Sequence, residues 1–172
     1  MQAYTHLVVG ALCGRAATSR IQGKAGVFVG VVVAALTHPF LDILCQVTYH
    51  PVGGSSIRGP DWIAYHLVAY ALAIAFAVRL RQHWIAMWAA LWPDLDWVLR
   101  PLHLGWPEGA IHAFLFGLPG LRHLQSFVLT YLPDFRAHWI AGLPELAVSI
   151  VIAVVLVRGE RRPEPALAFS PA

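Results

Sequence analysis

GVFVGVVVAALTHPFLDILC, residues 26–45, is the stretch that decides the fold class of this 172-residue chain. It carries no charged side chain before Asp42. As a helix it would be about 30 Å long, which is the thickness of the hydrocarbon core of a bilayer. An apolar run of this length indicates a transmembrane helix. We therefore expect an integral membrane protein.

The composition of the whole chain agrees with this expectation. Apolar residues make up 58% of the chain and charged residues only 12%, whereas soluble domains contain about one quarter charged residues. The basic residues behind the net charge of +3 are scattered singly, which argues against a nucleic-acid surface. We predict a single helical membrane domain over residues 1–158. A disordered cytoplasmic tail, rich in Pro and Arg, is expected over residues 159–172.

Four other stretches are candidate spans. Residues 62–78 and 139–157 have sufficient length, and each begins with a Trp that suits an interfacial anchor. Residues 83–99 are long enough but end in two carboxylates, and residues 3–17 are short. The sequence predicts an all-α, polytopic transmembrane bundle of about four to five spans. The segment 100–138, which contains several His, Pro and Gly residues, suits a re-entrant or interfacial helical hairpin that covers a site.

The distribution of basic residues predicts the orientation. Eight of them would lie on one side of the membrane, next to the ends of the expected spans, and four would be spread over longer loops on the other side. By the positive-inside rule the first side is cytoplasmic, which places the C-terminus in the cytoplasm and the protein in the inner membrane. The eight residues are Arg15, Arg20, Lys24, Arg79, Arg81, Arg158, Arg161 and Arg162.

Ionisable side chains occur inside the expected spans, where each costs roughly 2.5 to 3.5 kcal/mol on insertion scales and commonly marks function. His38 and Asp42 are four residues apart and so share one helical face. Asp94 and Asp96 follow Pro93 in another segment, and His6 would lie at the outer end of the first. We expect all five side chains at one depth, near the outer face.

Imidazole nitrogens and carboxylates that meet at one depth are the ligands of a buried divalent metal, whose charge offsets the desolvation of the carboxylates. We predict His6, His38, Asp42, Asp94 and Asp96 as ligands. A mixed His and Asp set suits zinc or manganese, with iron also compatible, better than calcium. Two other interpretations remain: His38 and Asp42 could be a hydrogen-bonded packing pair, and the two later Asp residues could lie in an exposed loop.

The motifs TH at 5–6, THPFLD at 37–42 and PDLD at 93–96 together resemble those of the membrane-bound metal-dependent hydrolase family, which includes the LexA-binding inner-membrane hydrolases. The family's HRGxTHS element is represented only in part, by RHLQS at 122–126, and the order of the motifs differs. The resemblance implies a metal-dependent hydrolase. It also suggests His123 as a catalytic acid or further ligand.

The expected substrate is a phosphoester or a lipid headgroup, because the site would face the interface. The partners expected are therefore membrane lipid and a small-molecule or lipid substrate, with no nucleic acid. Two alternatives use the same residues differently. The His and Asp cluster could conduct protons or metal ions, or it could serve only to pack helices in a structural membrane protein.

Overall fold

The computed structural model of the chain describes residues 2–49, 60–96, 110–136 and 138–160, and these contain helices and no strand. The prediction of an all-α fold is confirmed for them. In chain order the main helices are α1 (Ala3–Thr18), α2 (Gly23–Ile43), α3 (Pro60–Arg79), α4 (Trp84–Leu91), α6 (Ala110–Phe116), α7 (Pro119–Tyr131) and α8 (Gly142–Glu160). Short 3₁₀ turns cover Leu44–Val47, Arg81–His83, Trp92–Asp94 and Trp139–Ala141.

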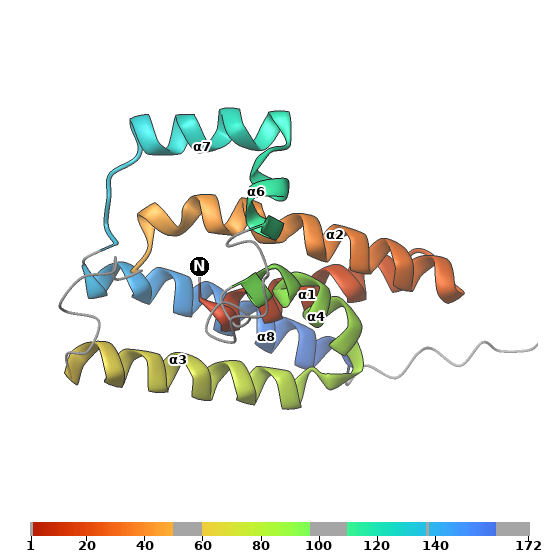
Figure 1. Cartoon of the computed structure of the whole chain (residues 1–172). Helices are drawn as coiled ribbons and strands as arrows, with labels where there is room; N and C mark the ends of the chain where they lie inside the picture. The colour runs from red at the N-terminus through yellow and green to blue at the C-terminus, as the bar shows by residue number, and fades with distance from the viewer. Residues whose placement is uncertain (1, 50–59, 97–109, 137, 161–172) are drawn as a thin grey trace, which may run out of the picture.

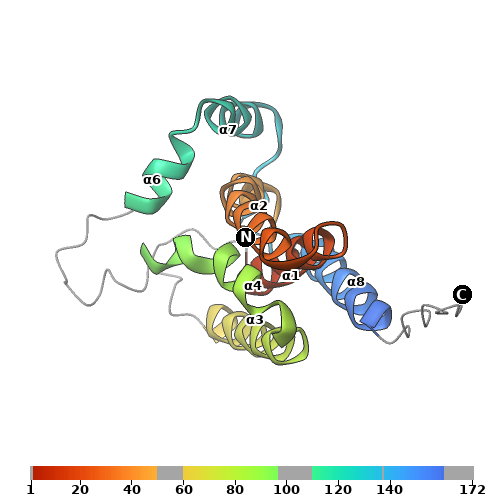
Figure 2. The same ribbon diagram turned by 90° about the vertical axis from the view of Figure 1, so that its right-hand side faces the viewer.

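Helix α1 is the centre of the bundle, and α2, α3, α4 and α8 surround it (Figure 2). Small residues make this close approach possible. A Cβ atom added at Gly10 would lie 2.8 Å from the Ala86 carbonyl oxygen, and one added at Gly14 would lie 2.9 Å from the Ala86 Cβ. The backbones of α1 and α4 therefore lie close together. This close approach brings polar groups of neighbouring helices within contact distance.

The helices run alternately in two directions (Figure 1). Helices α1, α3 and α8 run one way and α2 runs the other, so the ends of α1, α3 and α8 lie on the same side of the molecule as the start of α2. The Arg15 side chain reaches from α1 to α8 on this side and donates a 2.7 Å hydrogen bond to the Leu156 carbonyl.

Two helical stretches are long and apolar enough to cross a membrane: Gly23–Val47 and Gly142–Gly159. A third span is possible if Ile63–Arg79 and Arg81–Asp94 act as one broken span, although the two are bent by 85°. The described residues therefore offer two or three candidate spans, fewer than the four to five expected.

The predicted spans at 3–17 and 83–99 account for the difference if α3 and the α4 segment act as one broken span, and otherwise the predicted span at 62–78 is missing as well. Helix α1 has 16 residues, short of the roughly 20 needed to cross a bilayer. Helix α4 has only eight residues, because the chain tightens into a 3₁₀ turn at Pro93, whose ring disfavours a continuous α-helix.

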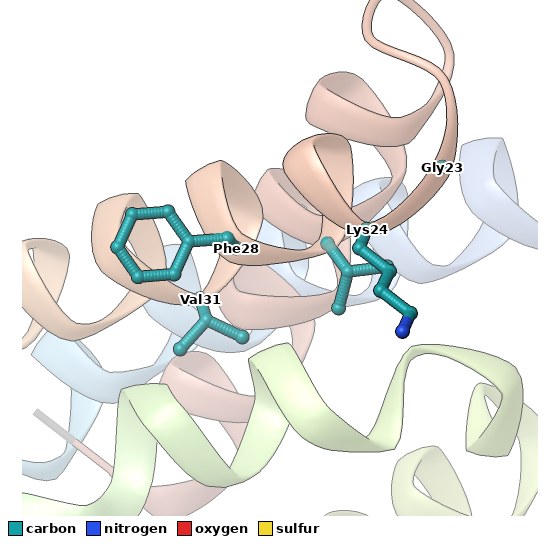
Figure 3. Close-up of a pocket in the computed structure, with 5 residues that line it drawn as sticks. Gly23, Lys24, Phe28 and Val31 are labelled. Carbon is teal, nitrogen blue, oxygen red and sulfur yellow. The ribbon is translucent and has the colours of Figure 1, made fainter.

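The outer faces of the long helices are apolar, which is consistent with association with a membrane. Phe28 on α2, Leu67 on α3 and Val151 on α8 are 68%, 65% and 60% exposed. A shallow apolar groove at the start of α2 is lined by Gly23, Lys24, Val27, Phe28 and Val31 (Figure 3). Water would solvate such faces poorly, whereas lipid tails match them.

Helices α6 and α7 lie within residues 100–138, where a hairpin is expected, and α7 packs against α2 (Figure 1). The Gln46 side chain, just after α2, donates hydrogen bonds to the Val128 and Leu132 carbonyls and so holds the end of α7. That this segment forms a re-entrant or interfacial hairpin stays a prediction. The predicted tail falls largely outside the described residues, since these end with α8 at Glu160.

Candidate metal centre

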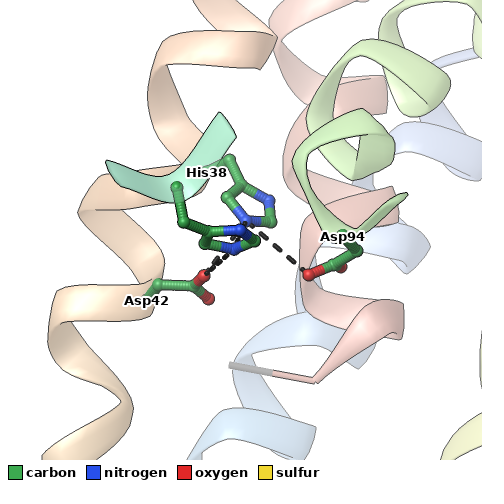
Figure 4. A group of neighbouring side chains, drawn as sticks. His38, Asp42 and Asp94 are labelled. Atoms are coloured by element: carbon green, nitrogen blue, oxygen red, sulfur yellow. Dashed lines mark hydrogen bonds and ion pairs between the residues drawn. The ribbon is translucent and has the colours of Figure 1, made fainter. Parts of the chain in front are cut away.

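The last turns of α2 present His38 and Asp42 on one face, as the spacing of four predicts. The His38 Nε2 and an Asp42 carboxylate oxygen lie 3.0 Å apart. Asp94, in the 3₁₀ turn after α4, points at the same nitrogen from the opposite side, with its carboxylate 3.7 Å away (Figure 4). Two helices that are distant in sequence thus direct their polar groups at one point.

A fourth residue, His112 on α6, completes the group. Its Nε2 lies 3.3 Å from the His38 Nε2 and 3.5 Å from the Asp42 carboxylate. One ligand atom from each of His38, Asp42, Asp94 and His112 lies within 4.8 Å of all the others. These four residues could therefore hold a metal ion.

Hydrogen bonds on the far sides of the two imidazoles decide which nitrogen faces the centre. The His38 Nδ1 lies 2.7 Å from the Ala90 carbonyl oxygen, which can only accept, so Nδ1 carries the proton. The His112 Nδ1 lies 2.9 Å from the Asp96 carboxylate and donates in the same way. In the neutral rings both Nε2 atoms then point lone pairs at each other and at the Asp42 carboxylate. Such acceptors repel unless a cation or a proton lies between them.

His6 and Asp96 each support one member of the group. The buried His6 ring stacks on His38 with centroids 4.3 Å apart, and its Nε2 lies 3.1 Å from the second Asp42 oxygen. Asp96, which is 3% exposed, accepts hydrogen bonds from both the ring and the backbone N–H of His112. Partners of this kind orient metal ligands and fix their tautomers.

The surroundings of His112 favour its protonated form, and the exposure of the cluster differs from one residue to the next. Hydrogen bonding to Asp42, and then to Asp96, raises the pKa of His112 above its usual value of 6.5 despite partial burial. The His38 side chain is fully buried, whereas the Asp94 side chain is 36% exposed. The cluster is therefore buried at His38 and partly exposed at Asp94.

The separations of the ligand atoms can be compared with those around a bound metal ion. Tetrahedral zinc, with bonds of about 2.0 to 2.1 Å, separates its ligand atoms by about 3.3 Å. The two Nε2 atoms are 3.3 Å apart, and their distances to the nearer Asp42 oxygen are 3.0 and 3.5 Å. The His38 Nε2 and the Asp94 carboxylate are farther apart, at 3.7 Å, and the group as a whole could hold a metal ion.

Three of the five predicted ligands, His38, Asp42 and Asp94, belong to the converging group. Direct ligation by His6 and Asp96 stays a prediction, since the structure gives each a hydrogen bond to a group member. Asp96 is buried, so the interpretation that placed both later Asp residues in an exposed loop is wrong for it. His123 lies exposed on α7, outside the converging group, and its catalytic role stays a prediction.

His112 is the ligand candidate that the sequence did not single out. The segment 100–138 contains His103, His112 and His123 at irregular spacing. Nothing in that spacing indicates which of them faces α2, because the choice depends on how the hairpin folds back. The only feature of the sequence that could have pointed to His112 was that it lies in a segment expected to cover the site.

No family model, curated protein sequence or solved structure matches this chain. The resemblance to the membrane-bound metal-dependent hydrolases therefore stays a prediction that rests on its short motifs, and the geometry of the centre is the ground for a functional hypothesis.

Proposed function

We propose that this protein is a metal-dependent hydrolase of the inner membrane that acts on a phosphoester, with lipid headgroups included. The observation that carries the proposal is the convergence of two imidazole nitrogens and two carboxylates whose other hydrogen bonds turn lone pairs toward one point. Helix packing alone does not require acceptors to face acceptors.

His38, Asp42, Asp94 and His112 would hold the metal, and His6 and Asp96 would orient Asp42 and His112. A bound divalent ion supplies a Lewis acid for the scissile group and lowers the pKa of water toward neutrality. The chain's own contribution is to fix the ligands, to bury His38 and to leave Asp94 accessible to substrate.

The proposed site lies nearer the outer face. His38 is 15 residues beyond the start of α2 at Gly23, which is about 22 Å along a helix, or roughly three quarters of a hydrocarbon core. The side where α2 starts carries Arg20, Lys24, Arg79 and Arg158 at helix ends. The positive-inside rule makes that side cytoplasmic, with the C-terminus there as well.

A proton or metal-ion pathway is the second candidate function, and a specific observation favours it. The rings of His6, His38 and His112 form a row, with successive centroids 4.3 and 5.3 Å apart. The buried Nδ1 of His6, at the inner end of this row, has no hydrogen-bond partner among the described residues. A row of imidazoles can relay protons.

The metal content of detergent-purified protein, measured by elemental analysis, tests the proposal. Wild type should carry near-stoichiometric zinc, manganese or iron, and a His38→Ala, Asp94→Ala double variant should lose it. His123→Ala is the matched control, because it removes an exposed imidazole outside the group and should retain the metal. Phosphoester and phospholipid substrates are then compared with the metal-loaded wild type.

The outcomes separate the candidates. Absence of a specific metal in folded wild type, even after metal is supplied, overturns the hydrolase proposal. Proton or metal flux into vesicles that requires His38, without hydrolysis, establishes the pathway instead. Hydrolysis that disappears in His123→Ala while metal is retained supports the predicted acid role of His123.

A further inference from the structure

An apolar groove of about 330 Å³ lies between α3 and α4, beside α1. Its lining includes Leu7 of α1, Ala77 of α3 and Met87, Trp88 and Leu91 of α4, and none of its lining residues carries a charge. Its volume is within the range of about 300 to 1,000 Å³ typical of small-molecule sites. A ligand there would be recognised by shape and apolar contact alone.

The sharp bend between α3 and α4 creates this groove. The two helices diverge by 85° across the turn that follows Arg79, and α3 lines the opening with the small side chains of Ala73 and Ala77 and with Ile74. The indoles of Trp84 and Trp88, both more than half exposed, stand on its α4 side. Ala73, Ile74 and Ala77 on the α3 wall and the aromatic residues on the α4 wall leave an apolar groove.

One end of the groove lies against the turns that carry the candidate metal centre. Leu91 lines the groove, while its neighbour Ala90 accepts the hydrogen bond from His38, and Asp94 follows three residues later. On α1, Leu7 lines the groove and adjoins His6. The other end is at Trp84, beside the turn near the basic end of the bundle. The groove at Gly23 and Phe28 is at the opposite end of α2 from His38 and has no such link.

We infer that the groove between α3 and α4 binds one acyl chain of a lipid whose phosphorylated headgroup lies at the metal centre. The inference rests on the proposed function and narrows its substrate class from phosphoesters in general to phospholipids. A lipid in the outer leaflet carries its headgroup outside and its chains toward the midplane. The groove has that direction, since it leads from the turns near Asp94 toward the cytoplasmic end.

The test measures lipid retention by native mass spectrometry on detergent-purified protein freed of metal by a chelator. The probes are palmitoyl-oleoyl phosphatidic acid and dihexanoyl phosphatidic acid, which share a headgroup and differ in chain length. Ala77→Phe fills the groove and should weaken retention of the long-chain lipid about tenfold. Ala75→Phe, at an exposed α3 position outside the groove, is the matched control and should retain it as wild type does.

Trp88→Ala provides a second variant should Ala77→Phe fail to fold, because Trp88 is more than half exposed and its truncation leaves the core intact. It should also weaken long-chain retention, with little change for the short-chain lipid. Equal long-chain retention by wild type, Trp88→Ala and Ala75→Phe overturns the inference. Elemental analysis of metal-supplied samples distinguishes failure of the hydrolase proposal from failure of the groove inference. If the groove variants weaken long-chain retention but wild type binds no metal, only the hydrolase proposal is overturned. If wild type binds metal but long-chain retention does not depend on the groove, only the groove inference is overturned.

Discussion

Helix α1 enters two buried polar clusters from adjacent residues, and the two clusters differ in kind. Thr5 faces α8, where its hydroxyl donates a 2.6 Å hydrogen bond to the Glu145 carboxylate, which also accepts from the Gln2 backbone N–H. His6 faces α2 and contacts Asp42. In the Glu145 cluster, donors meet an acceptor. In the His38 cluster, the Nε2 atoms of His38 and His112 face each other and the Asp42 carboxylate, and all of these are acceptors when the two rings are neutral.

This difference shows how a buried polar cluster that only joins helices can be distinguished from one that could bind an ion. The Oε1 atom of the buried Glu145 carboxylate receives two hydrogen bonds and so ties helices together, whereas its Oε2 atom is buried without a hydrogen-bond partner among the described residues. Two imidazole nitrogens whose protons are committed elsewhere, facing a carboxylate, need a cation or a proton. Hydrogen-bond direction is therefore more informative here than the mere presence of charged residues in a membrane helix.

The largest expected effect comes from Asp42→Asn, which removes the carboxylate at the middle of the His38 cluster. Asn keeps the shape but loses the charge that offsets a divalent cation, so metal affinity should fall by more than about a hundredfold. Isothermal titration with zinc measures it. Retention of wild-type affinity would show that the four residues do not form a metal site.

A smaller effect is expected from Asp96→Asn. This change weakens the acceptor of the His112 ring N–H without removing a member of the converging group, so metal affinity should fall by about 10- to 100-fold. The same titration, done beside Asp42→Asn, ranks the two residues. A loss as complete as that of Asp42→Asn would instead support the prediction that Asp96 is itself a ligand.

The Glu145 cluster should respond in stability and not in metal binding. Glu145→Ala leaves the Gln2 N–H and the Thr5 hydroxyl without their acceptor, at a cost of about 2 kcal/mol, and the Tm in detergent should fall. Glu145→Gln keeps an accepting oxygen and should cost less than about 1 kcal/mol. Both variants should bind metal as wild type does. Loss of metal in Glu145→Ala with an unchanged Tm would contradict the division into two clusters.

The smallest effect is expected at a polar pair outside both clusters. The exposed Asp134 accepts hydrogen bonds from Arg136, which lowers the pKa of the Asp134 carboxyl from 3.8 to about 2. A lowered folded-state pKa stabilises the protein above pH 3.8, and that contribution is lost as the pH falls through about 2. Because water screens the pair, this contribution is small, and the Tm of Asp134→Asn at pH 7 should be only slightly below that of wild type. A clear drop would show that α7 depends on this pair.

Local sequence patterns predicted much of the centre. The spacing of His38 and Asp42 required a shared helical face, and Pro93 indicated the break that aims Asp94 back at α2. The same patterns overestimated the number of spans, because hydropathy cannot reveal that the α4 segment folds at 85° to α3. They grouped His6 and Asp96 with the ligands, and this stays a prediction, because depth along a helix does not determine which oxygen or nitrogen a side chain reaches.

The sequence by itself determined that the chain is helical and apolar and that His and Asp residues recur at one level, because these features depend on periodicity and composition along single segments. Only the tertiary structure decided that His112 joins the cluster, that Asp96 supports it and that the Glu145 network is separate from it. Those outcomes depend on how α1, α2, α4 and α6 pack against one another. Close packing at small residues such as Gly10 determines this arrangement.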